Sequence, residues 1–179
     1  MPVDAQAAIE LLKELRALTA DENGAQRLAW SPVWLKAREW FLTKLRTLPV
    51  EHHYDAAGNS WATLPGQSEK CLILGSHLDS VPNGGWLDGC LGVMAAYAVL
   101  SRIAKQYDGK PPVTVRLVDW ADEEGARFGR SLFGSSAFAG TQTIEQDRGR
   151  TDATGIRLED ALAQCGVSVD AIRRIAAGA

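Results

Sequence analysis

One histidine and four carboxylates lie where they could bind metal ions and move protons in a hydrolysis reaction. These residues are His77, Asp79, Asp88, Glu123 and Glu124. The histidine and the first aspartate follow the apolar segment 71–76, and the two glutamates follow a second apolar segment, 113–120. Both segments are typical of strands buried on both faces. Because ligands in open α/β sheets bind beyond the carboxyl ends of strands, we expect these side chains to gather at one sheet edge.

The combination of imidazole and carboxylate groups indicates a site for divalent cations. Several carboxylates at one edge would repel each other unless a cation lay between them. Histidine nitrogen with aspartate and glutamate oxygen is typical of zinc and is also acceptable to manganese or cobalt. One carboxylate can bridge two ions, and paired ions suit hydrolysis because they activate water and polarise a carbonyl. Asp88 is expected at the start of a helix, where the N-terminus favours its negative charge.

The spacing of the residues separates their roles. In the segment 77–79, strand-like alternation points the side chains of His77 and Asp79 the same way. Asp79 can then accept the second imidazole N–H and hold the tautomer. Glu123 and Glu124 are adjacent and point to different sides, so one can bind metal while the other stays free as a general base.

The same residues also have a simpler interpretation. An isolated His-x-Asp is common, and an acidic run such as 122–124 is more often a solvated turn than a site. Local spacing by itself does not decide between the two interpretations. His52 and His53 are interpreted as neighbours on a half-exposed strand with no ligand role. Trp86 lies in the loop between His77 and Asp88, unlike the other tryptophans, which are assigned to packing.

The elements that must position these residues follow from periodicity and from turn chemistry. Apolar spacing predicts helices, and alternation or short apolar runs predict strands. Ser31 and Pro32 are typical of an N-cap and first helical residue. The predicted helices are 5–19, 32–48, 91–104, a short one within 131–140, 158–164 and 169–176, and the predicted strands are two within 50–64, 71–76 and 113–120. This order predicts an α/β three-layer sandwich with a mixed, largely parallel sheet flanked by helices.

Composition excludes several classes of protein. The 179 residues fit one domain, and a formal net charge of -3 without a basic block gives no sign of nucleic-acid binding. The three cysteines (Cys71, Cys90 and Cys165) are widely spaced and are expected to be reduced thiols. The longest apolar stretch, 91–100, is too short to span a bilayer, and the N-terminus does not resemble a secretory signal. A soluble, cytoplasmic protein is expected.

Two long motifs resemble a known family. The segments 75–89 and 122–135 read GSHLDSVPNGGWLDG and DEEGARFGRSLFGS. They resemble the hydantoinase/carbamoylase branch of the dinuclear metallopeptidase superfamily, which includes N-carbamoyl-L-amino-acid hydrolases, allantoate amidohydrolases and β-ureidopropionases. RLAWSP, DAAGN and TDATGIRLEDAL are similar to that family as well. The resemblance covers nearly the whole chain.

The resemblance implies a role for each candidate residue. His77 would bind one metal ion, Asp88 would bridge two, and Glu124 would bind the other. Glu123 would be the general base, and Asp79 would orient His77. Two divalent ions are implied for the complete enzyme, zinc or manganese, with cobalt or nickel as alternatives. The implied reaction is hydrolysis of a non-peptide C–N bond in a small N-carbamoyl-L-amino acid or an allantoate-type ureido acid.

The sequence also departs from the family pattern, and these departures lead to further expectations. Family members are longer, with further metal-binding histidines after the region that resembles 169–179. The histidines here are 52, 53 and 77. Residues 1–179 are therefore interpreted as the N-terminal portion of the metal-dependent catalytic domain, without the C-terminal catalytic portion and without the lid domain through which a homodimer is expected. Cys90 and Trp86 also depart from the expected residue types.

Two other functions remain open at this level. The chain alone is expected to be inactive, because a missing ligand weakens metal affinity. It could thus be an inactive fragment with weak metal binding. The other alternative is a related aminoacylase or dipeptidase, against which the VPNGG loop and the Arg-Phe after the glutamate pair argue.

Overall fold

The structure is a computed structural model that describes residues 2–142 and 144–172. Most of the predicted elements are confirmed within a few residues. The elements are α1 (Ala5–Thr19), β1 (Ala20–Asp21), β2 (Gly24–Ala25), α2 (Pro32–Leu45), β3 (Glu51–Tyr54), β4 (Ser60–Leu64), β5 (Cys71–His77), α3 (Cys90–Gln106), β6 (Thr114–Trp120), α4 (Phe133–Phe138), a 3-10 turn (Ile144–Gln146) and α5 (Leu158–Gln164). Of the helix predicted at 169–176, residues 169–172 are helical and 173–176 lie outside the described residues.

Four strands form a mixed sheet in the order β3-β4-β6-β5. The β3–β4 and β4–β6 pairs are antiparallel, and the β5–β6 pair is parallel, with Leu74 opposite Leu117. The mixed sheet flanked by helices is confirmed. The expectation of a largely parallel sheet needs correction for the described residues, because one pairing of the three is parallel. For the β3–β4 pair the reason is the short connection 55–59, which turns the chain back as a hairpin and leaves no room for a crossover helix.

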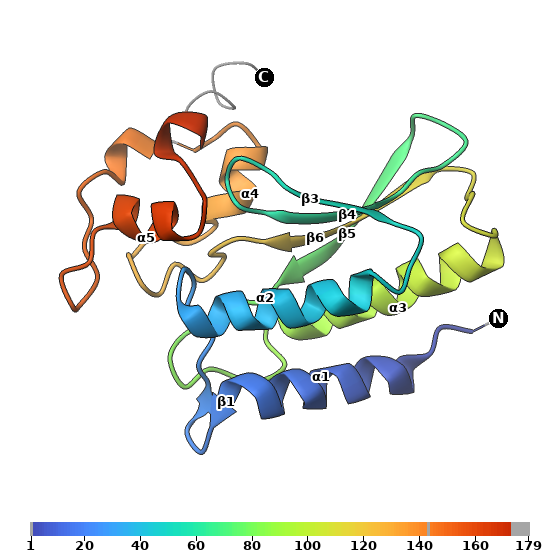
Figure 1. The fold of residues 1–179 in the computed structure, drawn as a ribbon, viewed down its shortest axis with the longest axis horizontal. Helices are drawn as coiled ribbons and strands as arrows, with labels where there is room; N and C mark the ends of the chain where they lie inside the picture. Colours follow the sequence, from blue (N-terminus) through green and yellow to red (C-terminus); the bar gives the residue numbers. More distant parts are fainter. Residues whose placement is uncertain (1, 143, 173–179) are drawn as a thin grey trace.

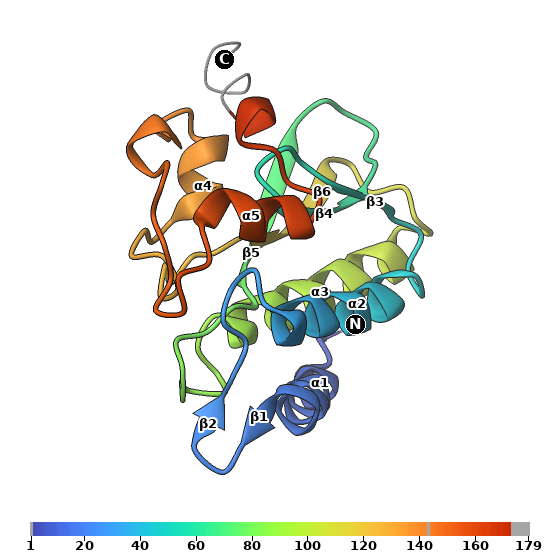
Figure 2. The same ribbon diagram turned by 60° about the vertical axis from the view of Figure 1, so that its left-hand side comes forward.

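Helices cover the two faces of this sheet unequally. Figures 1 and 2 place α1, α2 and α3 together on one side, with α4 and α5 beside one end of the sheet. On the first side, α3 packs against β5 and β6, and α1 packs against α3. On the other face, Phe138 of α4 packs against Trp61 and Trp120 at centroid distances of 5.2 and 5.4 Å. The third layer of the predicted sandwich is therefore smaller than the first in the described residues.

Strand β5 differs from its prediction. A strand buried on both faces was expected there, yet Leu72 is 46% exposed and Ile73 is 39% exposed. The prediction is wrong because β5 is an edge strand with β6 as its one described neighbour. Apolar composition does not report how many neighbours a strand has. Burial begins at the end of the strand, where Leu78 and Asp79 are almost completely enclosed.

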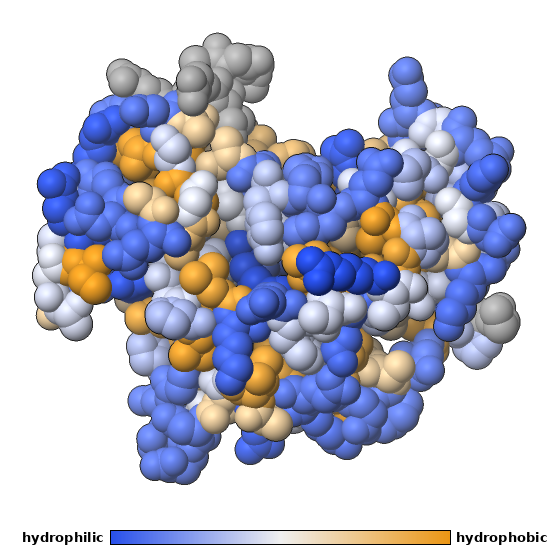
Figure 3. Space-filling view, in the orientation of Figure 1, coloured by the Kyte–Doolittle hydropathy of each residue, from blue (hydrophilic) through white to orange (hydrophobic). Residues whose placement is uncertain are grey.

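The surface and the cysteines agree with the composition. On the face seen in Figure 3, apolar side chains are divided into several small groups among hydrophilic ones. In the part of the chain that the structure describes, no helix is long and apolar enough to cross a membrane. The three cysteines are free thiols, as expected.

Candidate metal centre and active site

Three of the predicted site residues come together as a potential metal centre. His77, Asp88 and Glu124 each offer one ligand atom, and these atoms all lie within 4.8 Å of one another. His77 ends β5, Asp88 directly precedes the residue that caps α3, and Glu124 lies in the turn after β6. One nitrogen and two carboxylate oxygens at this separation fit a divalent cation. The three segments that the sequence predicted to meet therefore do meet.

Burial in this cluster changes from one side to the other. The imidazole of His77 is buried at 6% exposure, Glu124 is half-buried and Asp88 is exposed. The backbone under Asp88 is tightly turned: Gly89 has a φ of +64° and forms the N-cap of α3. A Cβ at Gly89 would lie 2.4 Å from Cε1 of His77, so the backbone passes directly against the imidazole ring. Glycine is required here for both reasons.

The carboxylate of Asp79 joins the two halves of the site. Its Oδ1 accepts the backbone N–H of Glu123 at 3.2 Å, and its Oδ2 accepts that of Glu124 at 3.1 Å. Nδ1 of His77 lies 3.1 Å from the backbone oxygen of Asp79 and 3.5 Å from Oδ1. The side chain was predicted to orient the imidazole. The structure puts it beside the imidazole, with the backbone carbonyl closer and the carboxylate occupied by the two amides.

The two glutamates occupy different positions, as adjacent residues in a turn must. Glu124 contributes to the three-residue cluster. Glu123 is partly exposed, and its Oε2 lies 3.4 Å from Nε2 of His77. Asp122, in the left-handed region with a φ of 51°, holds the turn. Its carboxylate accepts the indole N–H of Trp30 at 2.8 Å and the backbone N–H of Gly125 at 3.1 Å.

The pKa values in the cluster reflect burial and, after it, the concentration of negative charge. Burial lowers the pKa of His77, but the carboxylates of Asp79 and Glu123 outweigh it and raise the pKa to about 9. Burial raises the pKa of Glu124; the positive charge of His77 opposes this shift, and nearby carboxylates add to it. Burial, and after it the charge of Asp79, raises the pKa of Asp122 to about 7. A divalent cation would relieve this repulsion.

Other residues considered from the sequence lie elsewhere. Nε2 of His52 is 2.9 Å from Oγ of Ser60 in the β3–β4 hairpin. Trp86 packs against the main core, with the Arg16 guanidinium 5.5 Å from its ring centroid. This contact directs Trp86 toward α1.

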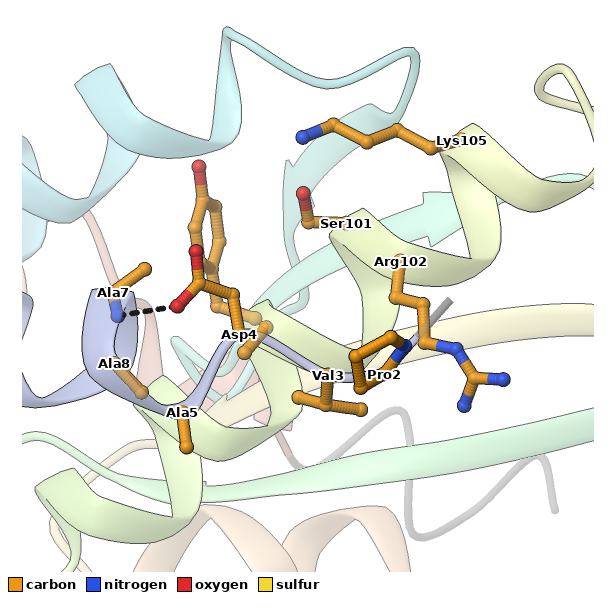
Figure 4. Close-up of a pocket in the computed structure, with 11 residues that line it drawn as sticks. Pro2, Val3, Asp4, Ala5, Ala7, Ala8, Ser101, Arg102 and Lys105 are labelled. Carbon is orange, nitrogen blue, oxygen red and sulfur yellow. Dashed lines mark hydrogen bonds between the residues drawn. The ribbon is translucent and has the colours of Figure 1, made fainter.

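A cavity of about 680 Å³ lies between the N-terminal segment and α3, and the candidate site residues are not among those that line it. Figure 4 shows the Asp4 carboxylate turned back to the backbone N–H of Ala7, which it caps at 2.9 Å. The side chains of Arg102 and Lys105 extend from α3 in different directions in the same view. They do not converge on one point, so this cavity is not assigned a function.

Sequence reasoning overlooked the buried polar residues that hold the site loops: Arg27, Trp30, Asp119 and Asp122. Asp119 had a usable signal, since a charged residue inside an apolar strand segment needs a partner. Arg27 and Trp30 belong to the RLAWSP segment, whose pattern resembles the family but does not by itself reveal a contact with residues about fifty or ninety positions away.

Comparison with known proteins places this geometry in a family. The model of peptidase family M28 matches residues 59–159, a segment that contains all five candidate residues and more than half of the chain. The chain belongs to peptidase family M28. It is 35% identical to allantoate amidohydrolase of Escherichia coli over 92% of this chain and 40% of that protein. It is 35% identical to N-carbamoyl-L-amino acid amidohydrolase of Geobacillus stearothermophilus over 86% of this chain and 38% of that protein.

A solved structure gives the same result. The hydantoinase/carbamoylase family amidase from Burkholderia ambifaria superposes with a TM-score of 0.84 at 30% identity, covering 93% of this chain and 42% of that chain. The resemblance to the hydantoinase/carbamoylase family is therefore confirmed. The chain spans about two fifths of the length of these relatives.

Proposed function

We propose that this chain supplies metal-binding and proton-transfer residues of an amidohydrolase that cleaves a non-peptide C–N bond. The observation that carries the proposal is the cluster of His77, Asp88 and Glu124, whose ligand atoms lie within 4.8 Å of one another. The substrate class is a small N-carbamoyl-L-amino acid or an allantoate-type ureido acid, in keeping with the names of the relatives.

Each residue has a separate task in this proposal. His77 would hold one ion, Glu124 would hold the second, and Asp88 would serve both. Bound zinc or manganese ions, with cobalt or nickel as alternatives, would activate water and polarise the scissile carbonyl. Glu123 is the general base: its carboxylate, partly exposed beside Nε2 of His77, takes the proton from the attacking water. Asp79 keeps His77 and the glutamate turn in register.

The proposal also concerns the rest of the site. Two ions need more donors than these three residues provide. Further ligands, histidines by the family pattern, are expected from a C-terminal catalytic portion, and residues 1–179 form the N-terminal portion of that domain. A homodimer through a separate lid domain is part of the same proposal. The chain alone is then expected to bind metal weakly and to turn over no substrate.

Metal titration of the purified chain tests the assignment. Calorimetry with zinc or manganese is expected to show weak binding that is lost in His77→Ala. His53→Ala is the matched control, since His53 is an exposed histidine on β3. Equal affinity in both variants would contradict the site. Robust hydrolysis of N-carbamoyl amino acids or allantoate by the chain alone would contradict the need for further ligands.

The match to a peptidase family supports one alternative, an aminoacylase or dipeptidase. An active form of the enzyme should be assayed with a ureido acid, an N-acyl amino acid and a dipeptide. Selective hydrolysis of the ureido acid supports the main proposal, and activity confined to the other two supports the alternative.

A further inference from the structure

Leu78 lies between His77 and Asp79, and buried charged side chains hold both sides of its backbone. Its N–H donates to Oδ1 of Asp119 at 2.8 Å. Its carbonyl accepts from Nε of Arg27 at 2.7 Å. Leu78, Asp119 and Arg27 are each 0% exposed. Two groups from distant parts of the chain therefore determine where this residue, and the neighbours on either side of it, can lie.

Asp119 is itself held in place by a second charged residue. Nε of Arg38 donates to its Oδ2 at 2.7 Å, and Nη2 of Arg38 donates to its backbone oxygen at 3.1 Å. Arg38 also donates to the carbonyl of Gly58 at 2.6 Å. One carboxylate oxygen of Asp119 thus pairs with a charge, and the other stays directed at the Leu78 N–H. This side of the Leu78 contact has little freedom to move.

Arg27 is unusual because it is completely buried and has no carboxylate partner among the described residues. Within residues 2–142 and 144–172 it forms no ion pair. Besides the Leu78 carbonyl, its guanidinium donates to Oγ1 of Thr19 at 3.2 Å and to Sγ of Cys90 at 3.0 Å. Burying a charge that lacks a counter-charge is costly unless hydrogen bonds compensate for it. Here the compensation comes from neutral acceptors in α1, in α3 and just after β5.

Two of those acceptors belong to segments that carry proposed ligands. The Leu78 carbonyl follows His77, and Cys90 is two residues after Asp88. The backbone of Arg27 also exchanges two hydrogen bonds with Ser80, each of 3.0 Å. One guanidinium therefore ties the end of β5 to the first turn of α3. The two segments joined in this way are those that carry His77 and Asp88.

We propose that Arg27 and Asp119 are positioning residues that fix the Leu78 peptide and thereby aim His77 and Asp79 into the metal centre. This proposal rests on the metal site assigned to the chain. Arg27 reaches the carbonyl and the thiol through two different nitrogens, Nε and Nη2, of a rigid planar fork. A lysine keeps the charge but brings a single ammonium nitrogen, so it cannot reproduce both contacts in their present geometry.

The experiment compares Arg27→Met and Arg27→Lys with the unchanged chain. Cobalt(II) titration followed by its visible absorption reports both affinity and coordination geometry. We expect Arg27→Met to lower the affinity about 10- to 100-fold, as loss of groups that orient ligands does, and to alter the spectrum. Arg27→Lys should restore part of the affinity. Arg116→Met is the charge control, because Arg116 is an exposed arginine on β6.

A stability control separates positioning from general destabilisation. Leu162→Ala removes a buried side chain from the other core cluster, around α5. It should lower the melting temperature and leave the cobalt affinity unchanged. Unchanged cobalt affinity in a folded Arg27→Met, or an equal loss in Leu162→Ala, would overturn the proposal. If Arg27→Met does not fold, Arg27→Lys takes its place: unchanged cobalt affinity in folded Arg27→Lys would then overturn the proposal.

A metal-free readout distinguishes this proposal from the proposed function. The ¹⁵N and ¹H shifts of the His77 imidazole report its hydrogen bonding without any ion. They should change in Arg27→Met and stay constant in Arg116→Met. If the unchanged chain binds no cobalt but these shifts move, the metal assignment fails and the positioning role stands. If cobalt binds and the shifts do not move, the positioning role fails alone.

Discussion

Oδ2 of Asp79 accepts the backbone N–H of Glu124 at 3.1 Å. This contact connects the two motifs of the sequence through residues that are 45 positions apart. Because Oδ1 accepts the neighbouring N–H of Glu123, the one carboxylate positions both glutamates relative to His77. The glutamate turn is thus arranged by backbone contacts, and the glutamate side chains remain available for chemistry.

Asp79→Asn should weaken both stability and metal binding. An asparagine presents one acceptor oxygen, so one of the two buried N–H groups faces an amide donor instead. We expect a loss of about 1–3 kcal/mol in the free energy of unfolding, typical of a buried group left unsatisfied, and roughly a 10- to 100-fold loss of metal affinity. Urea denaturation and calorimetry measure the two effects.

Asp88→Asn provides the contrast for that experiment. Asp88 is exposed, so its substitution should change stability by less than about 0.5 kcal/mol while metal affinity falls. If the two variants lost equal amounts of unfolding free energy, the hydrogen bonds from the backbone of Glu123 and Glu124 to the Asp79 carboxylate would not contribute to stability as we expect.

Glu123→Gln and Glu124→Gln should separate catalysis from metal binding. In an active form of the enzyme, Glu123→Gln is expected to abolish turnover while the metal stays bound, because only the proton acceptor is removed. Glu124→Gln should lower the metal content itself. Metal analysis beside the activity assay checks both. Loss of metal in Glu123→Gln would mean that the roles of the two glutamates are exchanged.

Gly89→Ala should displace His77. The added Cβ would lie 2.4 Å from Cε1 of the imidazole, at a φ of +64°. The positive φ alone costs about 1–2 kcal/mol for a residue other than glycine, and the clash adds to it. We therefore expect Gly89→Ala to lose more unfolding free energy than the backbone conformation alone would cost, and to bind metal more weakly. Urea denaturation measures the first effect, and metal titration measures the second.

Gly140→Ala is the matched control, because Gly140 has a φ of +69° and nothing within 4 Å of its added Cβ. It should show the cost of the positive φ and leave metal binding intact. Similar metal affinities in the two alanine variants would argue against the close approach to His77.

Asp152 should make stability depend on acid pH. A hydrogen bond from Thr154 and the Arg127 guanidinium lower the pKa of Asp152 well below its ordinary value, although burial opposes them. A carboxyl whose pKa is lower in the folded state stabilises the fold above its unfolded pKa of about 4, and this contribution disappears as the pH falls. The difference in unfolding free energy between the unchanged chain and Asp152→Asn should therefore shrink from about pH 6 to about pH 3.

Asp160→Asn controls for the loss of a charge, since Asp160 is exposed on α5. Urea denaturation at several pH values measures both variants. A difference that stays constant with pH would show that the Asp152 contacts do not depend on its ionisation.

The sequence by itself determined most of the local elements and which residues to consider for a metal-binding cluster. Helix α1 begins after Asp4 and helix α2 after Ser31, because these side chains accept the N–H groups at the helix starts. His77, Asp88 and the pair Glu123 and Glu124 could be grouped from the order of residues, because each stands at the end of an apolar segment or the start of a helix. The family resemblance, and not the spacing, then singled out Glu124 as the metal ligand. Such patterns involve residues that are close in the chain.

Tertiary structure decided which segments are neighbours. It placed β5 at an edge, where Leu72 is exposed despite its apolar surroundings in the sequence. It also brought Arg27 and Asp119 to the two sides of Leu78 across 51 and 41 positions of sequence. These contacts depend on how layers pack and on which buried polar groups find partners. The whole fold decides which buried polar groups pair with each other, and local periodicity does not contain this information.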